Sequence, residues 1–181
     1  MAELHVIGDH PDFLDLPWSR PLAAWESKRL VELPAGVHRH VVRFVAYERG
    51  VYAVKELPRH LARHEFDMLE RLRALQAPAV EPVALIDRPE VDGSEEWASA
   101  VVTRYLDYAF SYREVIPTDT FTARSDKLLD AFAHLLVELH LVGCFWGDCS
   151  LSNVLYRWDA GAIAVRMVDA ETVRLHPELT A

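Results

Sequence analysis

Residues 146–156 read Trp-Gly-Asp-Cys-Ser-Leu-Ser-Asn-Val-Leu-Tyr, and this stretch does most to decide the fold. It places Asp148 and Asn153 five positions apart, between an expected helix over 125–142 and an expected strand over 154–156. A carboxylate can orient an attacking hydroxyl and accept its proton, an amide oxygen can hold Mg²⁺, and phosphoryl transfer needs both groups close together. The segment therefore predicts a loop with a catalytic Asp148 and a metal-binding Asn153.

A further carboxylate follows this segment along the chain. Asp169 stands sixteen positions after Asn153, at the end of an expected strand over 163–168 that forms a hairpin with 154–156. A carboxylate that leaves a buried strand end can reach the metal ions that bridge nucleotide phosphates. Asp169 is therefore the second predicted metal ligand.

A lysine and a glutamate upstream form a predicted ion pair. Lys55 lies on an expected strand over 51–57, where alternation places it on the same face as Ala53. Glu65 lies in an expected helix over 59–75, on the apolar stripe made by Leu61, Met68, Leu72 and Leu75. Because a carboxylate on such a stripe is costly without a partner, Glu65 is the predicted partner of Lys55.

The order of the expected elements indicates an α+β fold. Three β-rich runs come first, and the turn Glu48-Arg49-Gly50 between the last two suits a hairpin. A helix, two strands, a second helix that stops at Gly143, a loop and a hairpin then follow, without the regular strand–helix alternation of a doubly wound sheet. The expected strands cover 28–33, 40–47, 51–57, 83–86, 98–106, 154–156 and 163–168, and residues 1–27 form an irregular arm packed on the domain.

The ordered set of motifs resembles the protein-kinase-like superfamily. The pattern Gly-Asp-x-x-x-x-Asn, a short hairpin and then Asp is similar to the catalytic and metal-binding loops of that group, and Ala53-Val54-Lys55 resembles its Ala-x-Lys strand. The Gly-Asp form, with an acidic residue two places after Asp169, resembles the small-molecule and lipopolysaccharide-kinase branch. Within this branch, the segment Trp-Gly-Asp-Cys-Ser-Leu-Ser-Asn resembles the corresponding segment of kinase-like proteins that carry an appended domain of unknown function numbered 4032.

This resemblance implies a fold, a cofactor pair and a set of roles. It implies an N-terminal lobe over 28–106, with an antiparallel sheet and one helix, and a truncated helical C-terminal lobe over 107–181. ATP and Mg²⁺ are the implied cofactors: Lys55, fixed by Glu65, would hold the phosphates, and Asn153 and Asp169 would hold the metal. Adenine and phosphate contacts are implied for Ala53, Gly36 and the hinge residues Arg104, Tyr105 and Leu106.

Three features depart from the family pattern. Only Gly36 stands where many kinases have a three-glycine loop, and Trp146 occupies the place of the usual histidine. The chain also ends at Ala181, only twelve residues after Asp169. We therefore expect a fragment lacking a C-terminal domain, a minimal version, or a chain completed by a partner, which includes a homo-oligomer.

Composition excludes some classes of function. The net charge is −9 and the basic residues are scattered, which disfavours binding to nucleic acid or to anionic membranes. The apolar stretches are too short for a transmembrane helix, and the start resembles no secretory signal, so we expect a cytoplasmic protein in which Cys144 and Cys149 are free thiols.

Simpler interpretations of the same residues stay open at this point. Asp148 and Asn153 could cap a turn, Lys55 could be a solvated edge-strand lysine, and Glu65 could pair with Arg63 or His64 at the surface. The favoured function is an ATP-dependent phosphotransferase that acts on a hydroxyl of a small-molecule or saccharide acceptor. The alternatives are a pseudokinase or nucleotide-binding regulatory module without turnover, and a protein-interaction domain on a kinase-like fold.

Overall fold

A computed structural model describes residues 2–33, 40–88, 99–112, 123–160 and 162–177 of the chain. The chain divides into two compact units. The first unit comprises residues 1–67 and 81–105, and the second comprises 68–80 and 106–181. The boundaries fall after Asp67, after Val80 and after Tyr105, where an expected strand leads into the predicted hinge.

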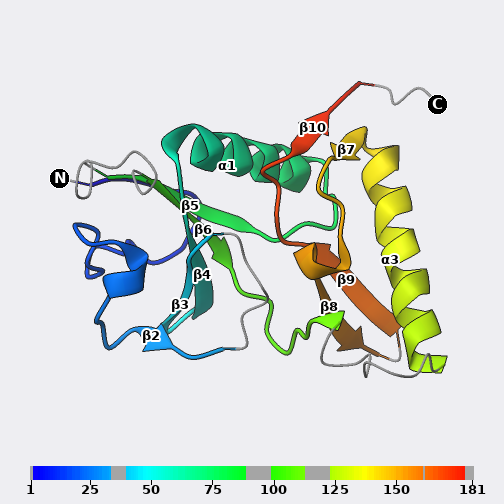
Figure 1. Cartoon of the computed structure of the whole chain (residues 1–181), viewed down its shortest axis with the longest axis horizontal. Helices are drawn as coiled ribbons and strands as arrows, with labels where there is room; N and C mark the ends of the chain where they lie inside the picture. Colours follow the sequence, from blue (N-terminus) through cyan, green and yellow to red (C-terminus); the bar gives the residue numbers. More distant parts are fainter. Residues whose placement is uncertain (1, 34–39, 89–98, 113–122, 161, 178–181) are drawn as a thin grey trace. The chain divides into compact units, whose positions relative to one another are not determined.

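The first unit is built on a six-stranded antiparallel sheet with the strand order β1-β5-β6-β4-β3-β2 (Figure 1). The predicted α+β fold class is confirmed, because this sheet is combined with only two long helices in the described chain. The strands are β1 (Glu3–Val6), β2 (Leu30–Val31), β3 (Val42–Tyr47), β4 (Gly50–Leu57), β5 (Pro82–Asp87) and β6 (Ser99–Arg104).

Strands β3 and β4 form the predicted hairpin. Tyr47 pairs with Gly50, so the connection consists of Glu48 and Arg49 alone. Gly50 has a φ of 133°, a value that side chains disfavour, which explains a glycine at this position. The tight hairpin fixes the register of β4 and therefore the face on which each β4 side chain lies.

The N-terminal segment covers one face of this sheet, opposite to the face of Lys55. Tyr52 and Val54 of β4 pack there on five buried apolar side chains of the segment: Phe13, Leu16, Trp18, Leu22 and Trp25. The expected packing of the arm is confirmed, but its expected irregularity is wrong at the start. Glu3–Val6 is a strand that pairs with β5, and a 3₁₀ turn, η1 (Leu22–Ala24), lies farther along.

Helix α1 (Arg59–Ala74) begins directly after β4. Its N-terminal half contributes Ala62 and Phe66 to a cluster with Leu57 and Val101, on the face of the sheet that also carries Lys55. The expected helix is confirmed, but Leu75 is not part of its buried stripe. Leu75 follows the end of the helix and is 47% exposed, because the chain turns at Gln76 with a positive φ of 56°.

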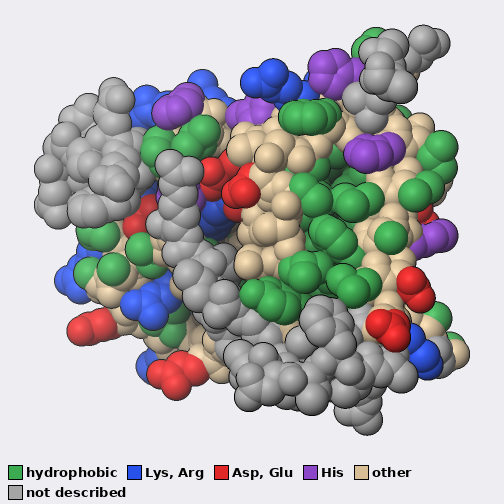
Figure 2. Space-filling view, turned by 45° about the vertical axis from the view of Figure 1, so that its right-hand side comes forward, with side chains coloured by type: hydrophobic (Ala, Val, Ile, Leu, Met, Phe, Trp, Pro, Cys, Tyr) green, Lys and Arg blue, Asp and Glu red, His purple; other side chains and the backbone are tan. Residues whose placement is uncertain are grey.

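The second unit contains α3 (Ala123–Leu141) and two small two-stranded sheets. Strands β8 (Val154–Asp159) and β9 (Ala162–Met167) form the predicted hairpin, with Val154 opposite Met167. Their buried residues and those of α3 form one core, which includes Leu128, Leu135, Leu139, Val154, Tyr156 and Met167. Hydrophobic side chains also gather at the surface (Figure 2). On α3 itself, Leu129, Val137 and Leu141 are exposed.

Two short strands that the sequence pattern did not indicate frame the loop around Asp148. Strand β7 (Cys144–Trp146) pairs antiparallel with β10 (Val173–Leu175). Gly143 ends α3 as predicted, with a φ of 76°, and a Cβ there would lie 2.0 Å from the carbonyl oxygen of His176. This close approach brings the chain that follows Asp169 alongside β7.

Within the described residues, no helix is both long and apolar enough to cross a membrane.

Candidate active site

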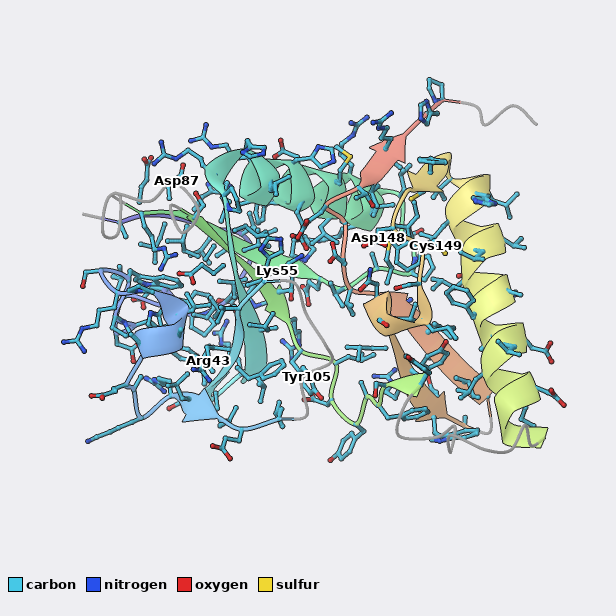
Figure 3. All side chains as sticks on the ribbon, viewed as in Figure 1. Arg43, Lys55, Asp87, Tyr105, Asp148 and Cys149 are labelled. Carbon is cyan, nitrogen blue, oxygen red and sulfur yellow. The ribbon has the colours of Figure 1, made fainter. Side chains whose placement is uncertain are left out.

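The Asp148 loop is held between the paired strands β7 and β10. Trp146 lies opposite Val173, so Gly147 and Asp148 leave β7 beside Thr172. Figure 3 labels Asp148 and Cys149 in the loop that follows β7. A Cβ on Gly147 would lie 3.2 Å from the Cβ of Thr172 and 3.3 Å from its carbonyl oxygen. Glycine therefore lets the two chain segments approach more closely than an alanine would allow.

Both backbone polar groups of Asp148 have partners in this loop. Its N–H donates to the Oγ1 of Thr172 at 2.8 Å, and its carbonyl oxygen accepts a hydrogen bond from the Nδ2 of Asn153 at 3.1 Å. Asp148 is exposed, and within the described residues its carboxylate makes no hydrogen bond or ion pair. The backbone is thus anchored on two sides, while the carboxylate remains available to a ligand.

Asn153 ends a 3₁₀ turn, η3 (Leu151–Asn153), and leads directly into β8. Its carbonyl oxygen accepts the N–H of Val168 at 3.0 Å, which continues the β8–β9 ladder by one step. Asn153 therefore faces Val168, and Asp169 is the next residue along the partner segment. This register brings the side chains at 153 and 169 to the same end of the hairpin.

The carboxylate of Asp169 has a fixed local orientation. Its Oδ1 accepts the backbone N–H of Glu171 at 3.1 Å, as in an Asx turn. This bond stabilises the tight turn over 170–172 that leads into β10. One carboxylate oxygen is therefore directed at its own backbone, and the side chain is partly buried.

The donor set of this loop fits a hard divalent cation. Asn153 offers an amide oxygen, because its amide nitrogen is already used by the carbonyl of Asp148, and Asp169 offers a carboxylate oxygen. Mg²⁺ prefers such oxygen ligands and keeps several waters or phosphate oxygens besides. Asn153 and Asp169 are suited to this ion, and their assignment as metal ligands stays a prediction.

The first unit holds the Lys55–Glu65 pair. Lys55 Nζ lies 3.1 Å from Glu65 Oε2, and the two side chains are 14% and 1% exposed. β4 is a central strand, so the interpretation of Lys55 as a solvated edge lysine is wrong. Glu65 is buried and Arg63 pairs with Asp87 at 2.6 Å, which also contradicts a surface pair of Glu65 with Arg63. A positive charge is thus held in place on the sheet.

The predicted adenine contacts are only partly covered by the structure. Ala53 lies two residues before Lys55 on the same face of β4, opposite Phe44. The N–H groups of Arg104 and Tyr105 donate to Glu81 and Val51 at 2.9 Å each, so neither can also donate to an adenine edge. Leu106 follows the end of β6, and Gly36 lies outside the described residues.

The two cysteines are free thiols, as predicted. Cys149 directly follows Asp148 and is exposed overall, but partial desolvation of its thiol and the negative charge of Asp148 raise the pKa of this thiol. Cys144 is buried on β7, and burial raises its pKa to about 11. Neither thiol is therefore an activated nucleophile at neutral pH.

Thr172 belongs to the site, although no sequence motif predicted it. Its hydroxyl contacts Asp148 across 24 positions of sequence, and that contact depends on the pairing of β7 with β10. The only available signal was its position in the segment Asp-Ala-Glu-Thr, and that segment carries no periodicity.

Comparisons with known proteins bear on the fold and on the family of this chain. The structure is similar to a solved structure entitled "WaaP in complex with acyl carrier protein", with a TM-score of 0.54 and 21% sequence identity over 82% of this chain. The match spans 65% of that chain's length, and it shows that the two share a fold. No protein among the curated sequences matches. The model of the lipopolysaccharide kinase (Kdo/WaaP) family matches residues 39–177, which is most of the sequence. The chain therefore belongs to the lipopolysaccharide kinase (Kdo/WaaP) family.

Proposed function

We propose that this chain is an ATP-dependent phosphotransferase that phosphorylates a hydroxyl group of a saccharide. The main support for this proposal is the geometry of the Asp148 loop. Hydrogen bonds with Thr172 and Asn153 anchor its backbone, and the Asp148 carboxylate has no partner among the described residues. Family membership supports the same reaction class, because lipopolysaccharide is a saccharide-containing acceptor. The identity of the sugar and the use of ATP are part of the proposal.

Each predicted residue has one role in this reaction. Asp148 orients the acceptor hydroxyl and accepts its proton as the oxygen attacks the γ-phosphorus of ATP. Lys55, held by Glu65 at 3.1 Å, binds phosphate oxygens of the nucleotide. Asn153 and Asp169 would hold Mg²⁺, which would neutralise charge on the phosphate oxygens. The remaining contribution of the protein is positioning.

The exposure of Asp148 also suits a large acceptor. A carboxylate at the surface of a loop can be reached by a hydroxyl on an extended saccharide without prior opening of the protein. Its backbone anchors mean that little conformational entropy is lost when the acceptor binds. These two properties favour a group-transfer role over that of a structural turn.

The test is transfer of radiolabelled γ-phosphate from ATP to a panel of saccharides that includes core oligosaccharides of lipopolysaccharide. Asp148→Asn should reduce transfer at least about 100-fold, in the range of a positioned general base. Asp130→Asn, which changes an exposed carboxylate on α3, should leave the rate unchanged. Full transfer by Asp148→Asn would exclude this role, and ATP binding without any transfer would favour the regulatory alternative.

A further inference from the structure

Thr172 has no assigned role in the proposed reaction. It is exposed, it begins the chain segment that enters β10, and its Oγ1 lies 2.8 Å from the backbone nitrogen of Asp148. An exposed threonine in a turn ordinarily contacts solvent. Here its hydroxyl oxygen accepts a hydrogen bond from the residue that carries the predicted base.

Two observations independent of this hydrogen bond show that the contact is built into the fold. The β7–β10 ladder places Val173 opposite Trp146, so Thr172 and Gly147 are the next residues out on the two segments. Gly147 has no side chain, and a Cβ there would lie 3.4 Å from Thr172 Oγ1 and 3.2 Å from its Cβ. Register and the glycine together set the distance at which the hydroxyl reaches Asp148.

The Thr172–Asp148 hydrogen bond also joins the Asp148 loop to the turn that follows Asp169. Thr172 follows Asp169 by three residues, and Asp169 fixes the turn between them through the N–H of Glu171. On the other side, the carbonyl of Asp148 accepts the side chain of Asn153. The predicted metal-binding turn is therefore connected to the peptide groups of Asp148 through the chain from Glu171 to Thr172 and the Thr172 hydrogen bond.

We infer that Thr172 is a positioning residue, which holds the backbone of Asp148 so that its carboxylate meets the acceptor hydroxyl in the correct orientation. This inference rests on the proposed function. In this role Thr172 acts through Asp148 and not through direct contact with substrate or nucleotide. Its loss therefore lowers the rate of the chemical step and leaves nucleotide affinity unchanged, since a displacement of about 1 Å at a reacting group can cost up to about 100-fold in rate.

The decisive variants are Thr172→Val, which keeps the shape and removes the acceptor oxygen, and Thr172→Ser, which keeps the oxygen. The first readout is hydrogen exchange at the Asp148 amide, measured by NMR on the whole chain, and it requires no turnover. Thr172→Val should speed this exchange about ten-fold or more, as expected for loss of a single hydrogen bond. Thr172→Ser should restore protection.

The second readout separates kcat from KM. For Thr172→Val we expect kcat to fall about ten-fold with the KM for ATP unchanged, and for Thr172→Ser to recover most of the loss. Gly147→Ala should act in the same direction as Thr172→Val, because its Cβ displaces Thr172. Arg174→Gln, at an exposed position on β10, is the control for disturbance of the strand and should change neither readout.

The outcomes distinguish this inference from the proposed function. Wild-type exchange at Asp148 in Thr172→Val overturns the positioning role, whatever the activity. Faster exchange with an unchanged kcat overturns it as well. If the wild-type chain transfers no phosphate to any acceptor, the proposed function fails, and the exchange rates alone decide whether Thr172 holds Asp148.

Discussion

The side-chain nitrogen of Asn153 donates a hydrogen bond to the backbone carbonyl of Asp148, at 3.1 Å. This bond decides which end of the Asn153 amide is available, because the nitrogen is used and the oxygen is directed elsewhere. It also couples two residues with different predicted roles, since a change at 153 alters both a metal ligand and an anchor of the catalytic loop.

Replacement of Asn153 by alanine should therefore lower the rate of phosphoryl transfer strongly and the free energy of unfolding only slightly. We expect Asn153→Ala to lower phosphoryl transfer at least about 100-fold, since it removes a metal ligand and releases the Asp148 carbonyl. The lost hydrogen bond is exposed, so the free energy of unfolding should fall by only about 1 kcal/mol. Transfer rates at several Mg²⁺ concentrations and urea unfolding measure the two effects. Ser152→Ala, in the same 3₁₀ turn, is the control, and equal losses in both variants would argue against a ligand role.

The Lys55–Glu65 pair allows a double-mutant test in the first unit. Lys55→Met leaves the carboxylate of Glu65, which is 1% exposed, without its lysine and should lower the free energy of unfolding by about 3 kcal/mol. The double change Lys55→Met with Glu65→Leu should recover part of this loss, because the buried charge is also removed. Both variants should lack phosphoryl transfer. A double variant no more stable than the single one would show that the charge of Glu65 is not the source of the cost.

A second buried ion pair should stabilise the N-terminal segment. Arg88 and Glu56 are 1% and 2% exposed and pair with each other, Arg88 donates to the carbonyl of Arg20 at 3.0 Å, and Glu56 accepts the N–H of Leu22 at 3.1 Å. Arg88→Met should lower the free energy of unfolding by about 3–5 kcal/mol and make the segment susceptible to limited proteolysis.

Arg43 provides the matched control for this second pair. It also donates to the segment, at the carbonyls of Leu22 and Ala23, but it is an exposed residue. Arg43→Met should therefore lower the free energy of unfolding by no more than about 1 kcal/mol. If both arginine variants were equally stable, the buried pair would not be what fastens the segment.

Alkylation of Cys149 reports the charge of Asp148 without any turnover. Burial and the negative charge of Asp148 raise the pKa of this thiol, so the reactive thiolate should be scarce at pH 7 and become more abundant as the pH rises. Asp148→Asn removes the charge and lowers the pKa, so alkylation by iodoacetamide at pH 8 should be faster. Peptide mass spectrometry measures the rate at each cysteine, and Cys144, which is buried with a pKa of about 11, should react far more slowly.

The control for the alkylation experiment is Asp130→Asn, which should leave the Cys149 rate unchanged. An unchanged Cys149 rate in Asp148→Asn would contradict the electrostatic coupling between Asp148 and the thiol.

Features with local physical causes could be predicted from the sequence. The β3–β4 hairpin follows from Glu48-Arg49-Gly50, and the end of α3 follows from Gly143. The contact of Glu65 with Lys55 could also be predicted, since a charge on an apolar stripe demands a partner and strand alternation offered one. In each case a few neighbouring residues carry the whole signal.

Features that depend on distant pairing could not be predicted. Strands β1, β7 and β10 have four, three and three residues, too few to show an alternating pattern, and each is stabilised by a partner far along the chain. Thr172 was missed for the same reason, because its contact exists only once β7 and β10 are paired. The roles of Asp148, Asn153 and Asp169 stay predictions, as does the appended domain that the wider resemblance implied.

The most direct test of the proposed nucleotide and metal site is a crystal structure of the chain with a non-hydrolysable ATP analogue and Mn²⁺, whose anomalous scattering locates the metal. We expect an anomalous peak within coordination distance of the Asn153 amide oxygen and an Asp169 carboxylate oxygen, with Lys55 Nζ against the phosphates. Nucleotide bound elsewhere, or a metal that contacts neither Asn153 nor Asp169, would contradict it.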